Sequence, residues 1–168
     1  MGVMSEAGCP AVADPGADIV ALAQREGYRV EPLVGPSSIL MGLMGSGFNG
    51  QSFCFHGYLP IDDKEKSHVL RRLESESARE NRTQIFIETP YRNNKLLELI
   101  AETLAPDTKV CVAVDITDPE RESIITHTVA DWKKTRYDYN KRPTIFLIYR
   151  GAHEGKKLIY TTKGGRRR

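Results

Sequence analysis

Apolar positions in the later two thirds of the chain follow the two periodicities that distinguish strands from helices. Short apolar runs bounded by turn residues predict strands, and apolar residues spaced three to four apart predict helices. Strands are predicted at residues 51–59, 83–88, 109–115, 122–128 and 143–149, and helices at 64–80, 89–104 and 129–134. Because strands and helices alternate, we predict an α/β domain with a mixed five-stranded sheet and helices packed on it.

The first third of the chain also alternates predicted strands and helices, but it contains fewer of them. The pattern predicts the end of a strand at residues 2–4, a helix at 17–26 that Gly27 ends, and a short buried strand at 29–34. A second helix opens at the turn 35–38 and continues through residue 44. Two strands alone do not have the neighbouring strands that a parallel sheet needs. We therefore expect that an N-terminal piece of this domain is missing from the chain.

The glycine-rich stretch 45–50 separates the two patterns, and we predict the domain junction there. Residues 1–50 are then the remnant of one α/β domain, 51–150 a complete second domain, and 151–168 a basic, disordered tail. The stretch fits G-x-G-x-x-G. However, it follows a helix and precedes a strand, the reverse of a dinucleotide-binding loop. We interpret it as a flexible junction.

Composition narrows the class of protein. Of the 168 residues, 40% are hydrophobic and 27% are charged, which is ordinary for a folded protein. No apolar stretch approaches the ~20 residues of a membrane span. The three cysteines, Cys9, Cys54 and Cys111, lie far apart and have no metal-ligand spacing with the histidines. We therefore expect no membrane, no metal and no disulfide framework, and a reducing, cytoplasmic compartment.

The net charge of +2 is unevenly distributed. Residues 154–168 carry +5 and the rest of the chain carries −3. A basic tail on an acidic body can contact nucleic acid, and a solvated terminus is the simpler alternative.

Candidate binding groups lie in loops that follow predicted strands, where open α/β sheets bind ligands. Glu6 and Asp14 can hold a hydroxylated or cationic ligand, or can only shape their loop. The turn 35–38 opens a helix whose free N–H groups can hold an anion, or it is a plain helix cap. Arg92 can bind a phosphate, or can pair with Glu88 at the surface. No motif of covalent catalysis is present, which favours a reaction that depends chiefly on positioning.

In this order the loops resemble the tetrapyrrole methylase family of S-adenosylmethionine-dependent methyltransferases. Within that family they are most similar to the branch that methylates a ribose of small-subunit ribosomal RNA. The stretches that carry the resemblance are VMSEAGCPAVADPG, VEPLVGPSSILMGLMGSGF, FCFHGYLP, IFIETPYRNN, VCVAVDITDPERE and RPTIFLIY, which together run from about residue 2 to 150. The resemblance implies two α/β domains with S-adenosylmethionine in the cleft between them, and a homodimer.

The resemblance also implies roles for single residues. Glu6 stands where the ribosomal branch usually has Asp, and is the candidate catalytic base. Arg92 matches the E-S/T-x-x-R pattern of that branch, is the candidate substrate-binding residue, and favours an RNA substrate over a corrinoid. The positions that match the cofactor site are Ser37, Ser38, Glu88, Thr89, Ala113, Pro143 and Thr144.

The prediction is therefore an enzyme that methylates a ribose 2′-hydroxyl of small-subunit ribosomal RNA. Carbon methylation of a tetrapyrrole is one alternative, and a non-catalytic binding or dimerisation module is the other. The Gly-Pro-Gly-Asp cofactor loop of the family has no counterpart in these 168 residues. We therefore expect this chain alone to bind the cofactor weakly or not at all.

Overall fold

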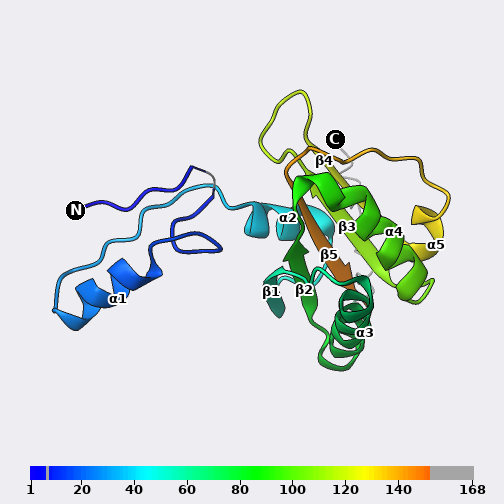
Figure 1. Cartoon of the computed structure of the whole chain (residues 1–168), viewed down its shortest axis with the longest axis horizontal. Coiled ribbons are helices and arrows are strands. Elements are labelled where there is room, and N and C mark those ends of the chain that lie inside the picture. Colours follow the sequence, from blue (N-terminus) through cyan, green and yellow to red (C-terminus); the bar gives the residue numbers. More distant parts are fainter. Residues whose placement is uncertain (7, 152–168) are drawn as a thin grey trace, which may run out of the picture.

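A five-stranded mixed sheet organises the later two thirds of the computed structural model, which describes residues 1–6 and 8–151 (Figure 1). Its strands are β1 (Phe53–Tyr58), β2 (Thr83–Ile87), β3 (Lys109–Val114), β4 (Ser123–Thr128) and β5 (Thr144–Tyr149). Their order in the sheet is β1-β2-β5-β3-β4. β1 and β2 are parallel, and every other pair of neighbours is antiparallel. The predicted mixed five-stranded α/β domain is confirmed.

Three helices cover one face of this sheet, namely α3 (Asp63–Glu80), α4 (Asn93–Thr103) and α5 (Val129–Trp132), with a short 3-10 turn, Pro90–Arg92, before α4. Asp62 caps α3, because its carboxylate accepts hydrogen bonds from the N–H groups of Lys64 and Glu65. The helices pack on the strands through one apolar core whose central members are Leu70, Leu73, Phe86, Leu96, Leu97, Ile100, Val110, Val112, Phe146 and Ile148.

Helix α2 (Ser38–Ser46) packs on the opposite face of the sheet. Two glycines allow its backbone to approach the strands closely. A Cβ on Gly42 would lie 3.0 Å from Ile145 Cγ2, and a Cβ on Gly45 would lie 2.9 Å from Ile124 Cδ1. Because side chains alternate across a strand, the sheet is buried on both faces. This second core consists of Leu43, Phe48, Ile85, Cys111, Ala113, Ile145, Leu147 and Tyr149.

The stretch 45–50 ends a helix, as its sequence context suggested. Gly47 has φ 74°, the left-handed conformation that closes α2. The division of the chain at residue 50 stays a prediction. In the structure α2, from the first segment, contributes Leu43 to the core of the sheet that follows. The predicted basic tail falls almost wholly on residues 152–168, outside the described residues.

The first segment contains both predicted helices, α1 (Ala17–Arg25) and α2, and neither predicted strand. α1 ends at Gly27, which has φ 74° as its predicted role requires. The strands predicted at residues 2–4 and 29–34 are wrong, because no described strand hydrogen-bonds to either segment. An apolar run becomes a strand only when a neighbour pairs with its backbone. Without that neighbour Leu33 and Val34 are exposed, and α1 buries no residue. Figure 1 shows α1 and its flanking segments extending to one side of the sheet.

Among the described residues no helix combines the length and the apolar character needed to cross a membrane.

We expect Gly45→Val to lower the free energy of unfolding by about 1–3 kcal/mol, because its side chain would overlap Ile124 and lift α2 from the sheet. Urea unfolding followed by fluorescence of Trp132, the only tryptophan, measures this change. Gly50→Val is the matched control, since a Cβ at Gly50 meets no atom within 4 Å. Equal unfolding midpoints for the two variants would contradict the packing described.

Candidate functional site

A hollow of about 1030 Å³ lies at one end of the sheet, where β1, β2 and β3 end and β5 begins. We call it the central hollow. Its walls come from residues 6–13 and 36–41, from β1, from residues 87–90 and 113–121, and from the start of β5. Seven of the nine predicted site residues line it, namely Glu6, Ser37, Ser38, Glu88, Ala113, Pro143 and Thr144. The other two, Thr89 and Arg92, do not line it but contact Glu88.

The antiparallel pairing of β5 with β3 builds one wall of the central hollow. Thr144 lies opposite Val114 in the register, and the Asp115 N–H donates to the Pro143 carbonyl over 2.9 Å. Ala113 lies opposite Ile145 and is 1% exposed. Residues 113 and 143–144, which are thirty positions apart in sequence, therefore share one surface.

The start of α2 forms a second wall. Ser37 is the N-cap residue, but its hydroxyl makes no capping hydrogen bond. The first N–H groups of a helix have no partner inside the helix, and the helix dipole makes this end positive. The Cys9 thiol contacts the Pro36 carbonyl at 3.8 Å and so links the loop of Glu6 to this turn. A carboxylate or hydroxyl of a ligand suits this corner.

Glu88 is the centre of a buried charge cluster. Its Oε2 lies 2.6 Å from Lys66 Nζ, and each of the two side chains is 4% exposed. The Thr89 N–H donates to Glu88 Oε1 over 2.8 Å, and Arg92 Nη2 lies 3.3 Å from the same oxygen. Burial by itself raises the pKa of Glu88. However, the hydrogen bonds from Lys66 and Thr89 and the charges of Lys66 and Arg92 lower this pKa by more than burial raises it. The pKa of Glu88 therefore lies below its ordinary value.

Arg92 is held against this cluster. Besides its ion pair with Glu88, its Nε donates to Thr89 Oγ1 over 3.3 Å, and its side chain is 35% exposed. The Glu88–Arg92 pair considered from the sequence forms, but with a buried carboxylate rather than at the surface. The exposed part of the guanidinium remains available to an anionic ligand beside the central hollow.

Lys66 was not among the predicted site residues, although the sequence contains a signal for it. It lies four positions before Leu70 and seven before Leu73, so a lysine occupies the apolar face of α3. A charged residue at such a position needs a buried partner. The partner, Glu88, is 22 positions away, and no local pattern indicates it.

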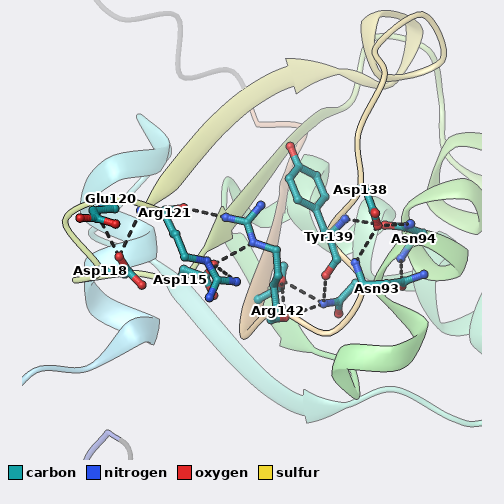
Figure 2. Close-up of polar contacts among 11 residues, drawn as sticks. Asn93, Asn94, Asp115, Asp118, Glu120, Arg121, Asp138, Tyr139 and Arg142 are labelled. Atoms are coloured by element: carbon teal, nitrogen blue, oxygen red, sulfur yellow. Dashed lines mark hydrogen bonds and ion pairs between the residues drawn. The ribbon is translucent and has the colours of Figure 1, made fainter.

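A second buried carboxylate fixes the loop that follows β3 (Figure 2). Asp115, in the left-handed conformation with φ 46°, accepts a hydrogen bond from Arg142 Nε over 2.7 Å and lies 3.1 Å from Arg121 Nη2. Arg142 also donates to the Arg121 carbonyl over 2.6 Å. Asp118 binds the N–H groups of Glu120 and Arg121. These contacts fix the loop 115–121, which forms one wall of the central hollow. The sequence did not indicate them, because Arg142 lies 27 positions from Asp115.

Asn93 fixes the start of β5 in the same way. It is fully buried, and its Nδ2 donates to the carbonyls of Tyr139 and Arg142 over 2.9 and 2.8 Å. The same nitrogen lies 3.0 Å from Thr144 Oγ1. Thr144 is therefore positioned before any ligand arrives.

The lining of the central hollow suits a ligand with both apolar and polar parts. Phe55, Ile87, Ile116 and Ile145 offer apolar surface, Ser37, Ser38, Thr117 and Thr144 offer hydroxyls, and Glu6 and Asp118 offer carboxylates. These groups fit the aromatic base, the ribose hydroxyls and the positive charges of S-adenosylmethionine. Within residues 1–6 and 8–151, no three His, Cys, Asp or Glu side chains are grouped to hold a metal ion.

Comparison with curated proteins finds relatives that share one name, ribosomal RNA small subunit methyltransferase I. The protein of this name from Vibrio cholerae is 33% identical over 117 residues, which are 70% of this chain and 39% of the relative. The one from Thermotoga maritima is 34% identical over 122 residues, 73% of this chain and 52% of the relative. The one from Bacillus subtilis is 36% identical over 124 residues, 74% and 41% of the two chains. The chain thus spans about half the length of these relatives or less. No family model matches it.

Solved structures with the same fold include two methyltransferases. The methyltransferase CobJ superposes with a TM-score of 0.54 and 20% identity, covering 84% of this chain and 61% of that one. The cobalt precorrin-4 methyltransferase CbiF gives a TM-score of 0.54, 19% identity and the same two coverages. At these identities the likeness establishes the fold alone.

Replacement of Lys66 by Met should destabilise the protein by roughly 3 kcal/mol at pH 7, because it leaves Glu88 buried without its closest cation. The lowered pKa of Glu88 means that the pair stabilises the folded state above the unfolded pKa of about 4.3. This contribution is lost as the pH falls through the folded value. The difference between wild type and variant should therefore shrink below about pH 4. Urea titrations at pH 7 and pH 3.5 measure it.

The double variant Lys66→Met/Glu88→Gln is the control for this pair. It removes the buried negative charge, so it should be more stable than Lys66→Met alone at pH 7. A Lys66→Met penalty that is the same at both pH values, and that the second substitution does not relieve, would show that the pair is not coupled.

Proposed function

Because this chain belongs to the tetrapyrrole methylase family, we propose that the protein containing it is an S-adenosylmethionine-dependent methyltransferase whose acceptor is a ribose 2′-hydroxyl of small-subunit ribosomal RNA. Small-subunit ribosomal RNA is inferred from the name that these relatives share, and the ribose 2′-hydroxyl from the resemblance to the ribosomal branch of the family. The same relationship is the basis for proposing a cytoplasmic protein that works as a homodimer.

The observation that carries the proposal is the convergence of seven predicted site residues on one hollow. They come from five separate stretches of the chain: the loop of Glu6, the start of α2, the end of β2, the end of β3, and the start of β5. Resemblance in sequence alone does not require such stretches to meet in space. A hollow of about 1030 Å³ also exceeds the size of most small-molecule pockets, so a cofactor and part of an acceptor can occupy it together.

We assign the cofactor to the side of the hollow formed by α2, β3 and β5. Ser37 and Ser38 would hold its polar groups, and Ala113 leaves room for it against the sheet. Pro143 and Thr144 would complete its binding surface. When bound, S-adenosylmethionine supplies a methyl group on a positively charged sulfur, so the transfer is an in-line displacement that depends mainly on alignment.

Glu6 is the candidate proton acceptor. It is exposed, lines the central hollow, and lies on a loop that the Cys9 contact ties to the start of α2. A ribose hydroxyl must lose a proton when its oxygen gains a methyl group, and a carboxylate within hydrogen-bond reach can take it. Glu88 is not suited to this task, because both of its oxygens are engaged by Lys66, Thr89 and Arg92.

Arg92 supports RNA as the acceptor rather than a tetrapyrrole. Its guanidinium stays one-third exposed beside the hollow, where it can bind a phosphate next to the target ribose. The methyltransferases CobJ and CbiF share the fold, and CbiF acts in cobalamin biosynthesis, but their low identity does not favour a tetrapyrrole for this chain.

The complete gene product, assayed beside the 168-residue chain, should transfer tritium from labelled S-adenosylmethionine to small-subunit ribosomal RNA or to intact small subunits. The modified position should resist alkaline hydrolysis, since a 2′-O-methyl group blocks attack on the neighbouring phosphodiester. Uroporphyrinogen is the competing acceptor in a parallel reaction. Label in uroporphyrinogen alone would replace the proposed acceptor, and label in neither would favour a non-catalytic module.

In the active complete product we expect Glu6→Gln to lower kcat about 10²–10⁴-fold and to leave cofactor affinity unchanged, because only proton removal is lost. Single-turnover methyl transfer and cofactor titration measure the two quantities. Asp14→Asn is the matched control, a carboxylate in the same segment that does not line the hollow. A Glu6→Gln variant as active as Asp14→Asn would exclude Glu6 as the base.

A further inference from the structure

The loop between α5 and β5 carries a concentration of free positive charge. Lys133, Lys134, Arg136 and Lys141 are all exposed, and we call them the basic ridge. None of the four forms an ion pair with a described residue. By contrast, most cations elsewhere in the described chain are paired with carboxylates; the unpaired others are Lys64, Arg71 and Lys109. Four of the seven unpaired cations of the described chain therefore lie in one loop, residues 133–143.

The second half of the loop that carries the basic ridge is anchored by hydrogen bonds (Figure 2). The Tyr139 N–H donates to Asn94 Oδ1 over 2.8 Å, and Asn94 Nδ2 donates to Asp138 Oδ1 over 3.0 Å. Asn93 binds two carbonyls of the same loop, and the Lys141 N–H donates to the Pro90 carbonyl over 2.9 Å. These contacts fix the backbone of the loop without a ligand, so binding costs less conformational entropy of the backbone.

Aromatic packing fixes the middle of the loop. The rings of Tyr137 and Tyr139 stack with centroids 5.6 Å apart and planes 9° apart. Both rings lie edge-on to the indole of Trp132, which is buried in the core. Arg136 precedes this stack directly.

We propose that the basic ridge binds the phosphate backbone of the RNA substrate and directs the target nucleotide to the central hollow. This inference rests on the proposed function. The loop leads from α5 to Pro143 and Thr144, which line the hollow, so a strand bound along it arrives at the acceptor site. Regularly exposed, unpaired lysines and arginines are what a polyphosphate chain requires, because each contact releases a condensed counterion.

Carboxylates near the basic ridge offset the positive charge of some of its residues, so the remaining cations should contribute most to phosphate binding. Glu98 and Glu102 of α4 line a small hollow together with Lys133, so they offset part of its charge. Asp138 is exposed, and its carboxylate accepts hydrogen bonds from Asn94 and from the Asn140 N–H. Lys134 and Arg136 do not line this small hollow and form no ion pair with a described residue, which makes this pair the sharpest test.

The test compares two double variants of the 168-residue chain. Lys134→Gln/Arg136→Gln removes one lysine and one arginine from the basic ridge. Lys64→Gln/Arg71→Gln removes the same pair of charges from α3, where both side chains are likewise exposed and unpaired. Binding to transcribed small-subunit ribosomal RNA is measured by filter retention between 50 and 300 mM salt, and circular dichroism checks that both variants are folded.

The ridge variant should bind RNA more weakly, and the slope of log K against log salt should fall by ~1.4–1.8, the value for two lost phosphate contacts. The α3 variant should keep the affinity and slope of the wild type. Equal slopes for the two variants, or no RNA binding by the wild-type chain at 50 mM salt, would overturn the proposal. Methyl transfer to RNA with an unaltered ridge-variant slope would refute the ridge alone. Label in uroporphyrinogen only would refute the proposed acceptor instead.

Discussion

The central position of β5 is the constraint on which the rest of the structure depends. β5 is hydrogen-bonded to β2 on one side and to β3 on the other, and its residues alternate between the two cores. Phe146 and Ile148 join the face covered by α3, α4 and α5, whereas Ile145 and Leu147 join the face covered by α2. Because β5 runs antiparallel to both neighbours, its start lies beside their carboxyl ends. Burial of the strand and construction of the central hollow therefore follow from one pairing.

Two buried carboxylates at that end of the sheet fix the loops that line the central hollow. Glu88 is paired with Lys66 from α3, and Asp115 is paired with Arg142 from the loop before β5. Leaving either carboxylate without its cation would be costly, so each pair fixes the relative position of two elements. The loops 88–92 and 115–121 thereby keep their shape without a ligand. Such preorganisation suits a reaction in which alignment of donor and acceptor contributes most of the rate.

Charged side chains have two different roles in two parts of the molecule: paired charges fix the hollow, and unpaired charges can attract a polyanion. Near the central hollow Arg121 and Arg142 are committed to Asp115 and fix the wall formed by residues 115–121. Along the loop 133–141 the cations are exposed and unpaired. Paired charges specify geometry, and unpaired charges attract a polyanion over a distance set by the salt concentration. The proposed methyl transfer needs both, a rigid pocket for a small cofactor and a broad surface for a large substrate.

The sequence by itself determined the elements whose signals are local. Apolar periodicity located all five strands and α3 to α5, and Gly27 marked the end of α1. The apolar pattern was wrong at residues 2–4 and 29–34, where it indicated strands but no described strand pairs with either segment. Only the tertiary structure decided that residues from 6 to 144 meet in one hollow, and that Glu88 and Asp115 pair with Lys66 and Arg142. These contacts join residues 22 to more than 100 positions apart, and the register of β5 and the seating of α2 bring them together. Neither leaves a periodic trace in the sequence.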